Sequence, residues 1–144
     1  MVKKTFIKGA IYTDNRGTLS FFNGFDMSGI KRMYEIAPSN ETLIRAWQGH
    51  EKEKKWFYCT QGSFIINLVK VTNFEQPLQN IKIAKTVLSA NKPGILAITG
   101  GYATGLKAVK PNSKLLVFSD FTVEQSKNDD FRFEPNFWKA EWTQ

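Results

Sequence analysis

Closely spaced turn signals are the feature of this sequence that most limits the folds open to it. Gly, Asn, Asp and Pro gather in short clusters, and the segments between them are rich in β-branched and aromatic residues. The clusters are Asp14–Gly17, Asn23–Gly24, Pro38–Asn40, Gln61–Ser63, Asn91–Gly94, Thr99–Gly101 and Lys110–Ser113. Most intervals between them are too short for the crossover helix that parallel strands need, so the sequence predicts antiparallel pairing.

The segments between the turns carry the strand signal. They are Thr5–Ile11, Leu19–Phe22, Lys31–Ile36, Leu43–Gln48, Trp56–Thr60, Phe64–Val71, Ile81–Leu88, Leu96–Thr99, Gly105–Val109 and Lys114–Phe118. Many short strands joined by tight turns predict an all-β sandwich or jelly-roll barrel, whose interior is filled by side chains or holds one ligand. The stretch Ser126–Trp142 lacks a regular period, and we expect it to pack across the barrel as a tail.

Length and hydrophobicity indicate a single domain, residues 1–144. A chain of 144 residues that is 42% hydrophobic can bury one packed core. No apolar stretch follows Met1–Phe6, and runs such as Phe64–Val69 are far too short to cross a bilayer. We therefore expect a cytoplasmic protein without a membrane segment. Cys59 has no second cysteine to pair with, and its aromatic surroundings are typical of an ordinary buried residue.

The charge balance favours an anionic partner. Twenty Lys and Arg against thirteen Asp and Glu leave a formal charge of +7 at pH 7. Such an excess suits a nucleic acid, a membrane surface or a phosphorylated small molecule, and charge alone does not choose among them. The basic residues are scattered along the chain, however, and no nucleic-acid-binding motif is present. We therefore expect neither a nucleic acid nor a membrane as partner.

The segment Arg45–Phe57 holds the residues most suited to chemistry. Strand alternation places Gln48 and His50 on one face, and in a small barrel only the inward face meets an enclosed ligand. His50 is the single histidine of the chain, so an unperturbed proton carrier for neutral pH is present once. Arg45 precedes these inward residues, and a buried guanidinium needs an anion.

This segment resembles the first cupin motif, a glycine-led strand with His-x-His, a later acid and a later Gly. Its first His position reads Gln48 and its second His50, while Lys54 and Lys55 stand where the acid is expected. The second cupin motif corresponds to Thr99–Thr104, with Thr104 in place of its His. A catalytic divalent ion needs three or four protein ligands, and only one of the usual imidazoles is kept. We therefore predict no metal and no other cofactor.

More specifically, the chain resembles the cupin-fold 3,4-ketoisomerases of dTDP-4-keto-6-deoxyglucose and, more distantly, the dTDP-sugar 3,5-epimerases. Four segments in matching order carry the resemblance: Asp14–Leu19, Ile30–Ile36, Arg45–Gly62 and Asp129–Arg132. The resemblance implies a double-stranded β-helix, a nucleotide-sugar substrate, a role in surface-polysaccharide sugar synthesis, and a homodimer.

The resemblance also implies roles for individual residues. A ketoisomerase moves a proton between neighbouring sugar carbons, so it needs a base and donors that stabilise an oxyanion. His50 is the expected base, and Arg45 and Tyr34 are the other expected catalytic groups. The expected substrate-binding residues are Lys31, Arg32, Gln48, Tyr58 and Tyr102.

Two alternatives stay open. Epimerisation needs an acid opposite the base, and the position of the usual tyrosine falls near Val117 or Phe118, although Tyr58 or Tyr102 can substitute. A catalytically inactive cupin that binds a nucleotide sugar is the second alternative, because Gln48, Thr104 and Phe118 occupy positions where catalytic groups are expected. We interpret the charged run 51–55 as a solvated turn, and aromatic strand residues such as Trp47, Trp56 and Phe57 as core.

Overall fold

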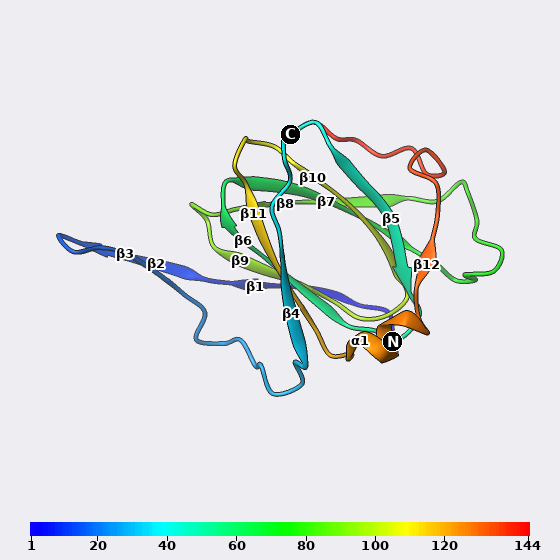
Figure 1. The fold of residues 1–144 in the computed structure, drawn as a ribbon, viewed down its shortest axis with the longest axis horizontal. Coiled ribbons are helices and arrows are strands. Elements are labelled where there is room, and N and C mark those ends of the chain that lie inside the picture. Colours follow the sequence, from blue (N-terminus) through cyan, green and yellow to red (C-terminus); the bar gives the residue numbers. More distant parts are fainter.

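The computed structural model describes residues 1–144, and its regular structure is almost entirely β-strand (Figure 1). The strands are β1 (Lys4–Lys8), β2 (Ala10–Asp14), β3 (Gly17–Phe21), β4 (Arg32–Ile36), β5 (Ile44–His50), β6 (Lys55–Gln61), β7 (Ser63–Lys70), β8 (Ile83–Ser89), β9 (Gly94–Ile98), β10 (Tyr102–Ala108), β11 (Lys114–Ser119) and β12 (Phe131–Arg132). The one helix, α1 (Val123–Lys127), has five residues, so no helix in the structure could span a membrane.

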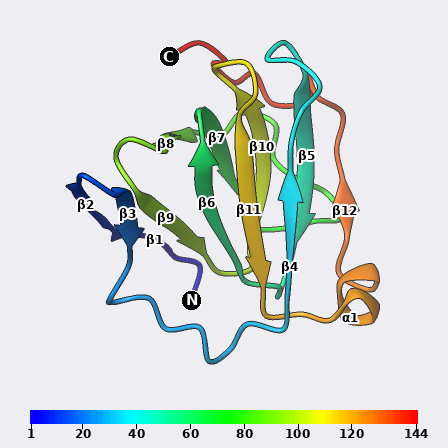
Figure 2. The ribbon, with the colours of Figure 1, turned by 60° about the vertical axis from the view of Figure 1, so that its left-hand side comes forward.

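Two five-stranded sheets make up the body of the molecule. Their strand orders are β1-β9-β6-β11-β4 and β12-β5-β10-β7-β8, and every ladder is antiparallel. The sheets face each other, and β4 and β5, which do not pair, lie on the two sides of an opening between them (Figures 1 and 2). The predicted all-β jelly-roll fold with antiparallel pairing is confirmed.

The main core lies between the two sheets. Strand β6 shows how alternation builds it, because Phe57 and Cys59 are buried while Trp56 and Tyr58 face outward and are half-buried. Burial raises the pKa of the Cys59 thiol to about 11, and the thiol donates to the Gln61 carbonyl oxygen. Cys59 is thus an unreactive core residue, as its sequence context predicts.

A second apolar cluster lies on the outer face of the sheet that contains β7. Trp138 of the C-terminal tail, only 2% exposed, packs edge-on against Trp47, and Trp142 contacts the same indole ring. Because the tail covers this face, β7 is buried on both sides from Ser63 to Val69, and its sequence is apolar there except for Ser63 and Asn67. The prediction that residues 126–142 pack across the barrel is confirmed, although the segment also contains β12.

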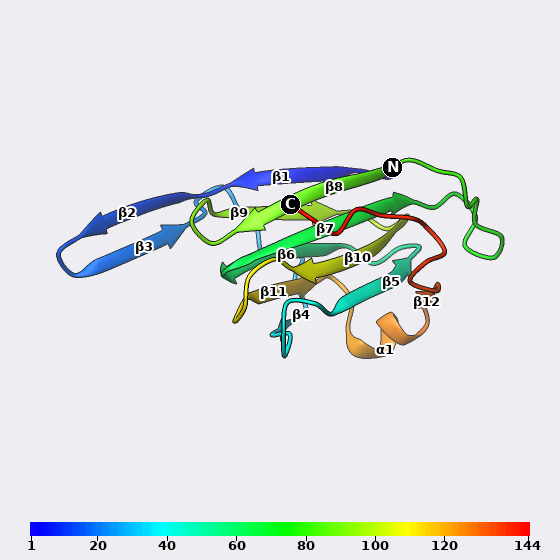
Figure 3. The same cartoon turned by 90° about the horizontal axis from the view of Figure 1, so that it is seen from above.

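The strand predicted over Thr5–Ile11 is wrong in its extent. The chain divides at Gly9 because β1 pairs with β9 only as far as Gly94, after which β2 leaves to pair with β3. A side chain at Gly9 would meet the ring of Phe22 at 2.4 Å. The β2–β3 hairpin, closed by Gly17 at φ 133°, projects from the body of the molecule (Figures 1 and 3).

Candidate functional site

A bulge in β5 decides which side chains face the space between the sheets. Gln48 lies opposite Thr104 and Arg45 lies opposite Leu106, so Ala46 and Trp47 together face one residue of β10. The extra residue shifts the alternation of β5 by one position. Arg45 and Gln48, three residues apart, therefore both reach the interior, while the Trp47 indole packs under the C-terminal tail.

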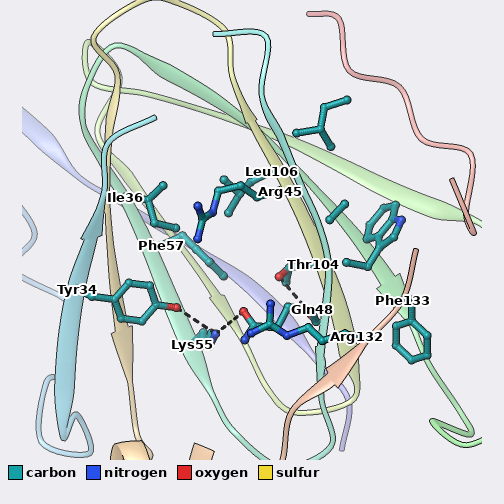
Figure 4. A pocket seen from close by; sticks show the side chains of 13 residues that line it. Tyr34, Ile36, Arg45, Gln48, Lys55, Phe57, Thr104, Leu106, Arg132 and Phe133 are labelled. Carbon is teal, nitrogen blue, oxygen red and sulfur yellow. Dashed lines mark hydrogen bonds between the residues drawn. The ribbon is translucent and has the colours of Figure 1, made fainter. Parts of the chain in front are cut away.

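These inward residues line a pocket of about 410 Å³ at the open side between β4 and β5 (Figure 4). Its polar groups come from both sheets: Tyr34, Arg45, Gln48, Lys55, Thr104 and Arg132. Apolar side chains, among them Ile36, Phe57 and Leu106, complete the wall. Such a mixture of an apolar wall and a few converging polar groups is typical of a small-molecule site.

A hydrogen-bonded chain crosses this pocket (Figure 4). The Lys55 ammonium donates to the Tyr34 hydroxyl at 3.1 Å and to Oε1 of Gln48 at 3.4 Å. The Gln48 amide in turn donates to Asp130 at 3.3 Å. Burial acts to raise the pKa of Asp130, but hydrogen bonds from Arg132 and Gln48 hold that pKa below its ordinary value. Asp130 is therefore a carboxylate at neutral pH.

A second hollow of about 340 Å³ adjoins the first and shares five of its lining residues. It adds Arg32, Ser126, Lys127 and Asp130 to the polar lining. The two pockets together are lined by five cationic side chains, Arg32, Arg45, Lys55, Lys127 and Arg132, and by one carboxylate, that of Asp130. We call them the basic cleft. Its charge suits an anionic ligand.

His50 lies at the end of β5, buried, and lines neither pocket of the basic cleft. Its Nδ1 is 2.6 Å from the carbonyl oxygen of Asp129 and 3.4 Å from a Glu53 oxygen, while Nε2 has no partner. Burial lowers the pKa of His50, and the charge of Lys55 lowers it further. A neutral ring whose Nδ1–H donates to the Asp129 carbonyl leaves the Nε2 lone pair free.

The interpretation of residues 51–55 as a solvated turn is wrong for two of the five side chains. Glu53 and Lys55 are only 1% and 2% exposed. Glu53 accepts hydrogen bonds from Ser119 at 2.5 Å, Ser126 at 2.7 Å and Arg32 at 3.1 Å. Asp129 accepts from the backbone N–H groups of residues 51, 52 and 53. The partners in these contacts belong to β4, β11 and the tail. The alternating charges of residues 51–55 give no indication of them in the sequence.

The structure brings together only some of the residues predicted as a site. Tyr34, Arg45 and Gln48 line both pockets of the basic cleft, and Arg32 lines the outer one. Four of the predicted residues line neither: His50, Lys31, Tyr58 and Tyr102.

Each of the last three has another environment. Lys31 is exposed, Tyr58 packs against Phe22 on the outer face of β6, and Tyr102 is buried in the core, where burial raises its pKa.

Lys55 and Arg132 are cleft residues that sequence reasoning missed. Alternation back from Phe57 places Lys55 on the inward face of β6, and that signal was available in the sequence. Arg132 belongs to the matched segment Asp129–Arg132 but carried no predicted role. No group of three or more His, Cys, Asp or Glu side chains is placed to hold a metal ion.

No profile of a known protein family and no curated protein sequence matches the chain. Solved structures do match it. One is the 3,4-ketoisomerase QdtA of Thermoanaerobacterium thermosaccharolyticum, crystallised as a His-to-Asn mutant with TDP-4-keto-6-deoxyglucose. It is 22% identical, with a TM-score of 0.69 over 93% of this chain and 90% of that one.

Two further structures extend the comparison. A 3,4-ketoisomerase from Helicobacter canadensis is 19% identical, with a TM-score of 0.71 over 95% of this chain and 96% of that one. The dTDP-4-dehydrorhamnose 3,5-epimerase of Bacillus anthracis, solved with TDP and pyrophosphate, is 14% identical, with a TM-score of 0.72 over 92% of this chain and 79% of that one. The chain therefore has the cupin jelly-roll fold found in dTDP-sugar 3,4-ketoisomerases and 3,5-epimerases.

Proposed function

We propose that this protein isomerises a nucleotide-linked 4-keto-6-deoxy sugar, with dTDP as the nucleotide, by proton transfer without a metal. We place the reaction in the cytoplasm, in the synthesis of surface-polysaccharide sugars. The observation that carries the proposal is the basic cleft, which has five cations and one carboxylate between the sheets of this fold.

The charges of the cleft suit a sugar nucleotide. A diphosphate needs cations that are not already neutralised, and Arg45 takes part in none of the ion pairs of the chain. Its guanidinium can bind phosphate oxygens in a bidentate manner. Arg32 and Arg132 each share a carboxylate already, with Glu53 and Asp130. Arg45 is thus the best candidate to hold the diphosphate.

His50 is the proposed base because its Nε2 has a free lone pair and no hydrogen-bond partner in the protein. Gln48, two residues before His50 on β5, lines both pockets of the cleft, while His50 lines neither. Two long hydrogen bonds, of 3.3 and 3.4 Å, hold the Gln48 side chain, so its displacement by a substrate costs little. Tyr34 is the proposed donor on the opposite wall.

We favour 3,4-ketoisomerisation over 3,5-epimerisation. Inversion of a sugar carbon requires an acid on the face opposite the base. Val117 and Phe118, near the position of the usual tyrosine, have no proton to donate. Tyr58 faces away from the cleft, and Tyr102 is in the core. Tyr34 is the one phenol that lines the cleft, and we assign it to the sugar carbonyl oxygen and not to a sugar carbon.

Solvent-deuterium exchange tests the proposal. Wild-type protein incubated with a dTDP-4-keto-6-deoxy sugar in D₂O should incorporate deuterium at a sugar carbon, measured by mass spectrometry and NMR. His50→Asn should slow this exchange by about 100-fold or more, since a positioned base contributes that much. Absence of exchange with keto-sugar nucleotides would reject the enzymatic proposal.

The alternative is a cupin that binds the nucleotide sugar without turnover. The position of His50 outside both pockets of the cleft favours it. Under this alternative dTDP raises the melting temperature, as any ligand specific for the native state does. The wild type shows no deuterium exchange, and His50→Asn leaves the affinity for dTDP unchanged.

A further inference from the structure

Lys55 is the only lysine or arginine that the fold buries. Its side chain lines both pockets of the basic cleft, and its ammonium donates to two neutral groups, the Tyr34 hydroxyl and the Gln48 amide oxygen. It takes part in none of the six ion pairs of the chain. A desolvated cation without an anion costs stability, and proteins tolerate such groups mainly at functional sites.

The buried carboxylates of Glu53 and Asp129 do not pair with Lys55. The two Glu53 oxygens are occupied by Arg32, Ser119 and Ser126, with His50 3.4 Å away. Asp129 is similarly occupied by three backbone N–H groups. Both carboxylates therefore serve other donors. The Lys55 ammonium lines both pockets of the basic cleft without an ion-pair partner, so a ligand can supply the missing negative charge.

We infer that Lys55 carries a proton between the two oxygen atoms of the reacting sugar, a role that depends on the proposed ketoisomerase function. When the base removes the proton from carbon 3, the C–H electrons form the C3–C4 double bond. The carbonyl π electrons move to oxygen 4, which then takes a proton from the Lys55 ammonium. The short-lived negative charge on oxygen 4 is the anion that Lys55 lacks in the free protein.

The second half of the reaction restores both groups. The base returns its proton to carbon 4, the C3–C4 electron pair forms the new C–H bond, and the hydroxyl on oxygen 3 loses its proton to the neutral Lys55 amine. A carbonyl forms at carbon 3, and the base and the ammonium end as they began, so no co-reactant is needed. Tyr34 and Gln48 keep the ammonium in place throughout.

Lys55→Met tests this inference, with Lys54→Met as the matched control on an exposed side chain. We expect Lys55→Met to lower kcat by about 100-fold or more, while the Kd for dTDP stays within about threefold of wild type. Because methionine fills the volume without the unpaired charge, the melting temperature should be unchanged or higher. Lys55→Ala should recover part of its activity when ethylammonium is added, and Lys54→Met should match wild type.

Each contrary outcome has a separate meaning. Wild-type exchange that Lys55→Met leaves intact overturns the role of Lys55 alone. A weaker Kd for dTDP with unchanged kcat assigns Lys55 to the diphosphate and also overturns it. A large drop in melting temperature, with no rescue of Lys55→Ala by ethylammonium, makes the residue structural. Absence of exchange in the wild type rejects the proposed function and this role together.

Discussion

The buried imidazole of His50 couples the candidate site to the stability of the fold. Desolvation lowers its pKa below the ordinary value of 6.5, and the charge of Lys55 acts in the same direction. The contacts with Asp129 and Glu53 oppose this shift without reversing it. The folded protein consequently holds the ring neutral at pH values where the ring of an unfolded chain is already protonated.

This difference predicts a pH dependence of stability. As pH falls below about 6.5, the unfolded chain takes up a proton at His50 that the folded chain does not, so the free energy of unfolding decreases. Above that pH the contribution is fully present. Urea unfolding at pH 7.5 and 5.5 should show a smaller loss for His50→Gln than for wild type. Equal losses in both proteins would contradict the assignment of this dependence to His50.

Sequence reasoning located part of the site residue by residue. Tyr34, Arg45 and Gln48 reach the cleft as predicted residues, but Arg45 does so only because the β5 bulge shifts the alternation of that strand. Glu53 was missed because its burial depends on partners more than twenty positions away, such as Arg32 and Ser119. Without knowledge of those partners, the alternating charges of residues 51–55 are interpreted as a solvent-exposed turn. Lys55 was missed although strand alternation back from Phe57 indicates its inward position.

At the scale of elements, the C-terminal segment holds the loop between β5 and β6 in place. Asp129, just before β12, accepts hydrogen bonds of 2.7, 2.9 and 2.9 Å from three consecutive backbone N–H groups of that loop. Its own carbonyl oxygen holds the His50 ring. The loop and the tail therefore form one structural unit, and the position of both Glu53 and His50 depends on a residue far away in the sequence.

Asp129→Ala should therefore destabilise the protein more than a similar change on the surface. It leaves one buried and two part-buried N–H donors without acceptors, and we expect a loss of about 3 kcal/mol in the free energy of unfolding. Asp120→Ala is the control, because Asp120 accepts one N–H bond, from Lys54, at 2.8 Å in an exposed setting. Its cost should be about 1 kcal/mol. Equal losses in chemical denaturation would contradict the proposed role of Asp129.

The elements themselves were largely predictable. Turn clusters and short apolar segments defined the strands, since both signals are local. The break at Gly9 and the bulge at Ala46 and Trp47 were not, because each depends on where another strand ends or how it pairs. The bulge has a functional consequence, since without it Arg45 would point away from the cleft.

At the scale of the whole molecule, the β2–β3 hairpin is the element that does not pack within the two sheets. It projects beyond the two sheets (Figure 1). Its Tyr12 and Leu19 side chains are 57% and 60% exposed. These two residues pair across the hairpin on one face, next to Thr13 and Thr18 on the other. An isolated two-stranded hairpin is only marginally stable in water, so an apolar face of this kind favours contact with another protein surface.

We expect this contact to be with a second copy of the chain, in line with the homodimer that the resemblance to the dTDP-sugar isomerases implies. Tyr12→Lys combined with Leu19→Lys removes the apolar pair and places like charges across the interface, so the dimer should dissociate to a 16.5 kDa monomer. Thr18→Lys, on the opposite face of the same hairpin, should leave the dimer intact. Sedimentation velocity distinguishes the two results. A wild-type monomer at tens of micromolar protein, or a dimer that the double variant leaves unchanged, would contradict the assignment of this hairpin to the interface.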